Sequence, residues 1–330
     1  GGVVIYDDKW SYSHHGTDPA SGLLCNAFDL VRIHKFGARD DGAKPQTPAN
    51  RLPSYVAMCE YAAHSDRVKE LLSKERMEDA KEEFDLTAEP EKDLSWTSKL
   101  DVNQKGEFRS TINNILIILE NDPEIKGKFA FNEFTSRAEV FDGLPWSSKA
   151  DRDWDDADDA GVRHYIENVY GITGAGKISD AITLSFNRHK FHPVREYLKS
   201  LKWDGVPRVD TLLIDYMGAQ DREYVRQVTR KWLCGAVARI LRPGIKFDHM
   251  LVLTGEQGIY KSTFLSILAK DWFTDSIQDV EGNQAIEKLM GSWIVEFGEL
   301  QAFNRSEINA IKRFITSQED RTRLAYDKRV

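Results

Sequence analysis

A glycine-bearing loop that ends in Lys-Ser constrains the fold of this sequence more than any other feature. The loop spans residues 255–263 and reads GEQGIYKST. An apolar run at 250–253 (MLVL) precedes it and predicts a short buried strand, and residues 263–270 (TFLSILAK) predict a helix. A strand, a loop with glycines and a helix, in this order, form the context in which phosphate-binding loops occur.

This loop carries the groups that a nucleoside triphosphate requires. Loop amides and the N-terminus of the following helix can point at the phosphates. Lys261 can reach the β- and γ-phosphates, and Ser262 can offer its hydroxyl to Mg²⁺. We therefore predict ATP and Mg²⁺ as ligands. The predicted nucleotide-binding residues are Gly255, Gln257, Gly258, Tyr260, Lys261, Ser262 and Thr263.

One residue departs from the usual pattern, which has glycine directly before the lysine. Tyr260 stands at that position. Glycine there lets the backbone approach the phosphates and adopt unusual dihedral angles, whereas tyrosine adds a Cβ and a large ring. Two interpretations follow. Tyr260 lowers the affinity for phosphate, or its ring turns outward and stacks on the adenine or on a neighbouring subunit.

Residues 292–300 (SWIVEFGEL) predict a second nucleotide element. Their apolar run ends at Glu296, and Glu299 follows three residues later. One carboxylate can hold Mg²⁺ and the other can polarise the attacking water. We assign Glu296 to the metal, together with Ser262, and Glu299 to the water, which makes both glutamates candidate catalytic residues. The alternative is a core strand that ends in a solvated acidic loop.

Charge is distributed unevenly along the chain. The formal net charge of −8 argues against a globally basic nucleic-acid coat protein. Residues 186–246, however, hold thirteen Lys and Arg against six Asp and Glu, with aromatic residues between them. Such a segment can bind the phosphates and bases of DNA, or it can be a solvated helix face. The candidate DNA contacts are Arg188, Lys190 and Lys202, and the candidate arginine fingers are Arg313, Arg321 and Arg323, each with a surface cation as the alternative.

Composition bounds the remaining possibilities. The 330 residues predict about two domains. Three cysteines lie far apart and form no CxxC pair, which argues against a disulfide scaffold or a cysteine zinc site and favours the cytoplasm. No apolar run approaches the roughly 18 residues that a membrane span needs. The sequence begins without Met, so we expect a fragment or a processed product.

Local patterns predict several other elements. Residues 3–15 and 129–141 have the alternation of hairpins, and residues 54–84 and 110–119 have helical patterns. Six aspartates between 151 and 159 can bind a divalent cation, although an exposed loop with a helix-capping carboxylate is the favoured interpretation. Residues 178–191 and 194–205 predict two amphipathic helices, the second ending at Gly205.

From about residue 95 to residue 330, the sequence resembles the virulence-associated protein E family. The motifs that carry this resemblance are STINNILIILENDP (110–123), FNEF (131–134), LPW (144–146), FHPVREYLKSLKWDGVPRVDTLL (191–213), AVARILRPGIKFDHMLVLTGEQG (236–258), GSWIVEFGEL (291–300), INAIKRFIT and DRTRLAY (308–326). Members of this family are phosphate-loop ATPases of phages, prophages and phage satellites. They are related to superfamily 3 helicases and to primase-helicases.

The resemblance implies an α/β phosphate-loop NTPase fold of the AAA+ or superfamily 3 type, preceded by a mainly helical α+β domain. It also implies that the chain stops before the last strands of its sheet. We expect three segments. Residues 1–90 are a remnant of an upstream primase-type or accessory region with a charged linker, residues 91–215 are a mainly helical linker or DNA-associated domain, and residues 216–330 are the ATPase domain.

The function implied is that of an ATP-dependent DNA helicase, translocase or replication initiator, which acts as a homo-oligomeric ring in the cytosol of a bacterial host. Tyr260 keeps a second function open, that of a DNA-binding initiator with impaired or absent ATP turnover. A primase module in the N-terminal region is a third hypothesis, and no pair of catalytic aspartates on a clear strand supports it. No membrane partner is expected.

Overall fold

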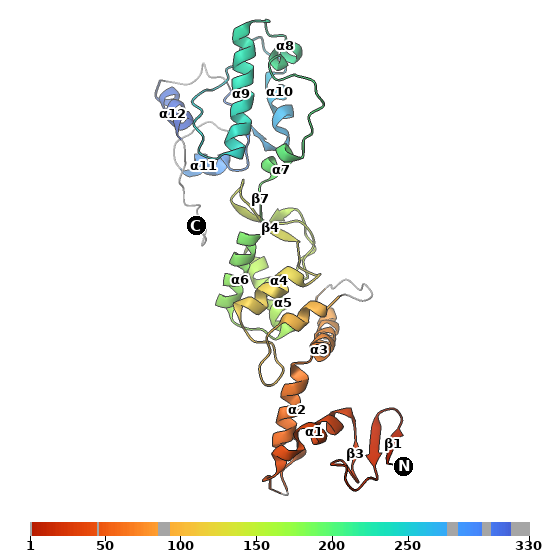
Figure 1. Ribbon diagram of the computed structural model, residues 1–330. Coiled ribbons are helices and arrows are strands. Elements are labelled where there is room, and N and C mark those ends of the chain that lie inside the picture. Colours follow the sequence, from red (N-terminus) through yellow and green to blue (C-terminus); the bar gives the residue numbers. More distant parts are fainter. Residues whose placement is uncertain (1, 45, 85–92, 276–282, 299–304, 318–330) are drawn as a thin grey trace. The chain divides into compact units, whose positions relative to one another are not determined.

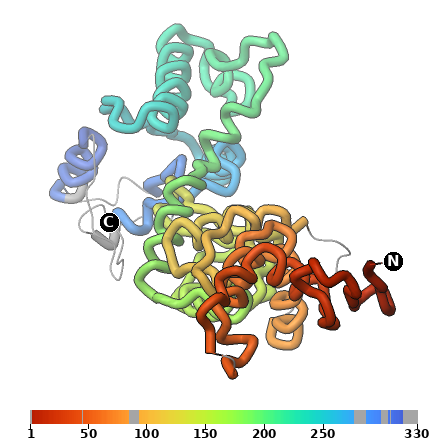
Figure 2. The backbone as a smooth tube through the Cα atoms, turned by 60° about the horizontal axis from the view of Figure 1, so that its bottom comes forward, coloured from red at the N-terminus to blue at the C-terminus, as the bar shows by residue number. Residues whose placement is uncertain are grey.

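The computed structural model describes residues 2–44, 46–84, 93–275, 283–298 and 305–317. The chain divides into two compact units. The first unit consists of Gly1–Ala130 and Ala138–His189, and the second consists of Phe131–Arg137 and Lys190–Val330. The first unit therefore includes all of residues 1–90, whereas the segment expected at 91–215 is divided between the two units. Figures 1 and 2 trace the chain through the two units.

The chain begins with a small antiparallel sheet in the order β1-β2-β3. Strands β1 (Val3–Tyr6) and β2 (Trp10–Ser13) form the hairpin that the sequence predicts, and β3 (Leu24–Cys25) pairs with β2. Asp7 and Asp8 make the turn with φ angles of 53° and 50°. Aspartate tolerates this left-handed conformation better than most residues, which explains why Asp-Asp closes the hairpin.

Three helices follow: α1 (Ala27–Phe36), α2 (Pro53–Ala63) and α3 (Asp66–Asp79). Asn26 caps α1, because its side chain accepts a hydrogen bond from the Asp29 amide at 2.8 Å. Helices α2 and α3 confirm the helical pattern between residues 54 and 84, with a break between them. Two short 3₁₀ turns, Gly37–Asp40 and Ala49–Arg51, lie between α1 and α2, and a third, Ala80–Glu82, follows α3. Two more occur later in the chain, at Ser95–Lys99 and Lys270–Trp272.

The core of the first unit lies between α4 (Ile112–Asn121), α5 (Asp156–Tyr170) and α6 (Ala175–Arg188). Helices α4 and α6 lie side by side (Figure 1). Ile115 and Ile118 on α4 are fully buried, as are Tyr165 and Ile166 on α5. Helix α4 confirms the prediction for residues 110–119, and α6 confirms that for residues 178–191 apart from its last residues.

The aspartate-rich stretch caps a helix, as the favoured interpretation of the sequence had it. Asp155 accepts hydrogen bonds from the amides of Ala157 and Asp158 at 2.8 and 3.1 Å, and it forms a capping box with Asp158. Asp158 is 1% exposed and pairs with Arg152 at 2.5 Å. Within the described ranges, no group of three or more His, Cys, Asp or Glu residues could hold a metal ion.

A four-stranded sheet has the order β6-β5-β4-β7. Its strands are β4 (Phe129–Asn132), β5 (Arg137–Val140), β6 (Arg152–Asp153) and β7 (Lys190–Phe191). Strands β4 and β5 are the pair predicted at 129–141. Strand β7 runs parallel to β4, and this pairing joins residues 131–132 to residues 190–191 within the second unit.

Besides β7 and the end of β4, the second unit contains six α-helices and a pair of short strands among its described residues. The helices are α7 (Pro193–Ser200), α8 (Leu212–Met217), α9 (Glu223–Leu241), α10 (Lys261–Ala269), α11 (Asn283–Leu289) and α12 (Arg305–Thr316). Strands β8 (Phe273–Thr274) and β9 (Ile294–Val295) pair in parallel. Ala310 and Ile311 on α12 pack with Val295 of β9 in an apolar cluster.

Two local predictions are wrong in this unit. Residues 250–253 form no strand, and Met250 and Val252 are 38% and 53% exposed. A strand needs a neighbour to pair its backbone groups, and β8 and β9 pair only with each other in the part of the chain that is described. Helix α7 ends at Ser200 rather than at Gly205. The Asp204 carboxylate accepts from the Val206 amide at 3.0 Å, which favours a turn over a further helical turn.

No helix among the described residues is long and apolar enough to cross a membrane.

Candidate nucleotide-binding site

The loop between residues 255 and 260 turns sharply into the N-terminus of α10. Gly255 and Gly258 have φ angles of 156° and 86°, which few residues other than glycine adopt. A Cβ at Gly255 would lie 2.6 Å from Cδ1 of Ile259, whereas one at Gly258 would meet nothing within 4 Å. Both glycines therefore serve the backbone turn, and Gly255 also allows a close approach within the loop.

Lys261 is the first residue of α10, and its side chain folds back over the loop. Its ammonium group donates hydrogen bonds to the carbonyl oxygens of Gly255 at 3.1 Å and Glu256 at 2.8 Å. The ammonium group therefore lies against the loop that leads into the helix. A phosphate bound there would meet a cation and the positive end of the helix dipole together.

Ser262 and Glu296 meet across the site. The Ser262 hydroxyl donates a hydrogen bond to Oε1 of Glu296 at 2.7 Å, although the two residues are 34 positions apart in the sequence. Glu296 follows β9 directly, and its amide donates to the carbonyl oxygen of Thr274 at 2.8 Å. The short parallel pair β8-β9 thus carries this carboxylate to the first turn of α10.

The second carboxylate oxygen of Glu296 is buried and has no hydrogen-bond partner among the described residues. Such a carboxylate oxygen is costly, because it has lost its water and gained nothing in exchange. A serine hydroxyl and a carboxylate are oxygen ligands that Mg²⁺ takes in proteins. The residues present therefore fit a magnesium ion, held by Ser262 and Glu296.

Tyr260 precedes Lys261 with φ 61° and ψ 31°, which is the left-handed conformation. A bulky residue there is an outlier that the surrounding loop must hold in place. The side chain is 75% exposed, so the ring points away from the loop. The structure thus contains both features considered from the sequence, a strained backbone and an outward ring.

Aromatic residues to which the sequence assigned no role in nucleotide binding contact the elements that form the site. The indole of Trp293 donates to the Ala236 carbonyl oxygen of α9 at 3.1 Å, and the Trp293 amide donates to the Trp272 carbonyl oxygen at 2.7 Å. Lys270, at the end of α10, lies 4.0 Å from the ring of Tyr197. These contacts connect the segment that leads into β9 to α9, and the end of α10 to α7. Their only sequence signal is the presence of large aromatic residues on both sides of the short strands.

The other predicted nucleotide-site residues make no side-chain hydrogen bond that links them to Lys261, Ser262 or Glu296 within the described part of the chain. Gln257 and Thr263 are exposed, at the loop and in the first turn of α10. Arg313 is exposed on α12. Glu299, the predicted water-activating residue, lies outside the described residues, as do the arginine-finger candidates Arg321 and Arg323.

The three candidate DNA contacts do not lie together in one unit. Arg188 belongs to the first unit, where it pairs with Glu120 at 2.5 Å. Lys190 lies on β7 in the second unit, 6.0 Å from the ring of Phe131. Lys202 is exposed in the loop after α7.

Carboxylates neutralise part of the basic segment 186–246. Arg226 pairs with Asp221 at 2.7 Å, Arg208 pairs with Asp204 at 2.9 Å, and Arg230 pairs with Asp210. The hydrogen bond from Arg208 is the main reason why the pKa of the Asp204 carboxyl falls to about 2. The charge available to a nucleic acid is therefore smaller than the residue count of the segment suggests.

The second unit is thus a mixed α/β structure with a lysine-bearing loop at a helix N-terminus and a carboxylate aimed at the same helix. Residues 198–330 match the family model of the virulence-associated protein E-like domain. This match confirms the resemblance seen in the sequence for these residues, while the resemblance of residues 95–197 stays a prediction. No curated protein matches the chain.

Proposed function

We propose that the second unit binds ATP with Mg²⁺ and hydrolyses it to drive work on DNA, as a helicase, translocase or initiator ATPase of phage origin. The observation that carries this proposal is the hydrogen bond between Ser262 and Glu296, together with the buried second oxygen of that carboxylate, which no described residue satisfies. A hydroxyl in the first turn after a lysine-bearing loop, set against a carboxylate at the end of a strand, is the arrangement that a phosphate-loop ATPase uses.

The residues have separate roles in this proposal. Lys261 leaves the carbonyl oxygens of residues 255 and 256 and binds the β- and γ-phosphates. The amides at the start of α10 orient the same phosphates. Ser262 and Glu296 hold Mg²⁺, and the bound metal would neutralise charge that develops on the phosphates. Glu299 polarises the attacking water.

The role on DNA rests on the match to the virulence-associated protein E-like domain and on the basic residues of 186–246 that have no acidic partner among the described residues. Lys190 and Lys202 are exposed and belong to the same unit as the nucleotide site. A homo-oligomeric ring is part of this proposal, since arginine fingers such as Arg313 act across subunit interfaces.

Tyr260 favours a second function, that of a DNA-binding initiator with little or no ATP turnover. Its left-handed backbone conformation is one that a glycine would adopt without strain. The strain makes the loop harder to hold in the shape that phosphates require. In this second proposal, nucleotide binding is weak or serves only to regulate DNA binding.

ATP hydrolysis by the chain, measured with and without single-stranded DNA, tests the proposal. We expect hydrolysis that DNA stimulates and that Lys261→Ala abolishes. Lys288→Ala is the matched control, because Lys288 is an exposed lysine on α11 of the same unit, outside the site. Equal hydrolysis by wild type and Lys261→Ala would contradict the assignment of the loop. DNA binding without any hydrolysis would favour the second function.

A further inference from the structure

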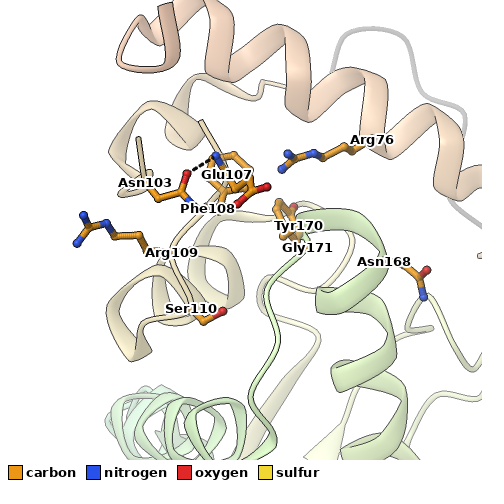
Figure 3. A pocket seen from close by; sticks show the side chains of 9 residues that line it. All are labelled: Arg76, Asn103, Glu107, Phe108, Arg109, Ser110, Asn168, Tyr170 and Gly171. Carbon is orange, nitrogen blue, oxygen red and sulfur yellow. Dashed lines mark hydrogen bonds between the residues drawn. The ribbon is translucent and has the colours of Figure 1, made fainter. Parts of the chain in front are cut away.

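A cavity of about 730 Å³ lies in the first unit, and the proposed nucleotide site uses none of its residues. Its volume falls within the range of pockets that bind small molecules and cofactors. Figure 3 shows the side chains around it, which come from α3, from the segment after the 3₁₀ turn at Ser95–Lys99 and from the end of α5. We call this cavity the Arg76 pocket; it is lined by Arg76, Asn103, Glu107, Phe108, Arg109, Ser110, Asn168, Tyr170 and Gly171.

Arg76 carries a buried donor that no described residue satisfies. Nη1 of its guanidinium group is buried without a hydrogen bond to the described part of the chain, while the group lies 5.1 Å from the centre of the Phe108 ring. Figure 3 shows the guanidinium directed toward Phe108 and Tyr170. An unsatisfied buried donor is costly, and more so when it is charged. The aromatic ring holds the guanidinium in place but does not satisfy its N–H groups.

Arg109 supplies a second cation on the other side of the pocket. Its Nε donates to the Val102 carbonyl oxygen at 3.2 Å, which anchors the base of the guanidinium group. In Figure 3, Asn103, Glu107 and Phe108 lie between the two arginines. Neither arginine has a carboxylate partner among the described residues. Two guanidinium groups on opposite sides of a polar hollow suit a ligand that carries more than one negative group.

The remaining polar groups suit a nucleoside. The Glu107 carboxylate accepts from the Asn103 side-chain amide at 2.8 Å, and it is the single acidic group among the described residues that line the pocket. A carboxylate repels phosphate but accepts hydrogen bonds from amino groups such as those on adenine and cytosine. Asn103 and Asn168 add amides that can both donate and accept.

We propose that the Arg76 pocket binds a nucleotide unit, with its phosphate on the arginines and its base against Glu107 and the amides. A single strand of nucleic acid and a free nucleotide share this chemistry. The position of the two arginines on opposite sides of the pocket favours the single strand, because it carries successive phosphates whereas dAMP carries one. With single-stranded nucleic acid as the ligand, this inference deepens the proposed function. It then rests on the proposal that the chain acts on DNA.

The test measures binding of a fluorescein-labelled oligodeoxyadenylate by anisotropy and of dAMP by titration calorimetry. Both use the full chain carrying Lys261→Ala, with EDTA present, so that the candidate nucleotide site does not contribute. We expect Arg76→Ala to weaken oligonucleotide binding about tenfold, as the loss of a charge-assisted hydrogen bond implies. The dependence of log affinity on log salt should flatten by about 0.7 for each phosphate that the variant no longer binds.

Arg67→Ala is the matched control, because Arg67 lies on the same helix with 78% of its side chain exposed and does not line the pocket. We expect no change in affinity from this variant. Melting temperatures of all variants check that each is folded. If Arg76→Ala is unfolded, Arg109→Ala decides the question by the same criteria, since Arg109 is exposed.

Weakened binding of dAMP but not of the oligonucleotide would support the pocket and make a free nucleotide its ligand. Unchanged binding of both by Arg76→Ala and Arg109→Ala would overturn the proposal. The two proposals fail separately. The Arg76 pocket is tested without a working candidate nucleotide site, and the ATPase is tested with the pocket intact.

Discussion

The Ser262 hydroxyl lies 2.7 Å from Oε1 of Glu296, and this hydrogen bond ties the first turn of α10 to the end of β9. It joins the two sequence elements from which a nucleotide site was expected. The bond uses one carboxylate oxygen and leaves the other buried without a partner among the described residues. The remaining oxygen of this pair is therefore available to a further ligand, such as a metal ion.

Replacing Tyr260 by glycine tests how the loop tolerates its left-handed residue. The conformation costs an L-residue about 1–2 kcal/mol, which glycine does not incur. We expect Tyr260→Gly to bind ATP with Mg²⁺ about tenfold more tightly, measured by titration calorimetry. Tyr260→Ala separates the effect of the backbone strain from that of the ring, because it removes the exposed ring and keeps the Cβ. We expect this variant to bind ATP like wild type. Weaker binding by both variants would mean that the ring contacts the nucleotide or a neighbouring subunit.

The three candidate DNA contacts should differ in their effect on salt dependence. Replacing Lys190 or Lys202 by a neutral residue should flatten the slope of log affinity for duplex DNA against log salt concentration. We expect a change of about 0.9 for each phosphate that is no longer bound. Arg188→Gln should change the slope less, because Arg188 is already paired with Glu120. Affinities measured at a series of salt concentrations give the slopes. Unchanged slopes in all three variants would place these residues on a solvated face.

A buried carboxylate stabilises the first unit. Asp122 is 0% exposed and accepts hydrogen bonds from the hydroxyls of Tyr165 and Tyr170, both at 2.7 Å. Burial and the nearby Asp122 charge raise the pKa of both phenols well above their usual value, so they remain donors. We expect Tyr165→Phe to lower the free energy of unfolding by about 1–3 kcal/mol in urea denaturation. Tyr224→Phe is the control, since Tyr224 is 76% exposed, and an equal loss from both variants would contradict this account.

The ion pair between Arg152 and Asp158 should make stability depend on pH. Burial raises the pKa of Asp158, but hydrogen bonds from Arg152, from the Asp155 amide and from Trp146 outweigh it and hold the pKa below its usual value of 3.8. A lowered carboxyl pKa stabilises the folded state above 3.8, and this stabilisation is lost as the pH falls through the folded-state pKa.

Arg152→Gln should therefore lose about 3 kcal/mol of stability at neutral pH, because it leaves a buried carboxylate without its cation. Its stability should also fall less steeply than that of wild type below pH 3.8. Urea denaturation at neutral and acidic pH measures both effects. Parallel pH dependence in the two proteins would assign the acid sensitivity to other carboxylates.

Local sequence signals predicted many of the elements because these elements depend on near neighbours. Asp7-Asp8 turns the first hairpin, Asp155 caps α5, and the helix expected at 263–270 is present as α10, which begins two residues earlier at Lys261. From the order of the loop and a later strand, the sequence predicted that Ser262 and Glu296 share one site, but it did not predict the hydrogen bond between them. Both motifs are recognisable because each has its own local pattern.

Several failures came where distant partners decide the structure, whereas the early end of α7 follows from the local turn at Asp204. Residues 250–253 are apolar, yet a strand forms only when another strand pairs with it, and periodicity contains no information about that neighbour. Arg188 and Lys202 lie in one basic segment of the sequence, but the fold places them in different units. The Arg76 pocket could not be predicted, because it joins residues of α3 to residues near 103–110 and 168–171 that no pattern connects.

The central claim is that Ser262 and Glu296 hold a metal ion that accompanies ATP. Titration calorimetry of ATP with Mg²⁺ and with EDTA, for wild type, Glu296→Gln and Ser262→Ala, tests it most directly. The account predicts that wild type binds ATP more tightly with Mg²⁺ than with EDTA, that this difference largely disappears in both variants, and that their affinities in EDTA match that of wild type. The same gain from Mg²⁺ in wild type and in both variants would contradict it.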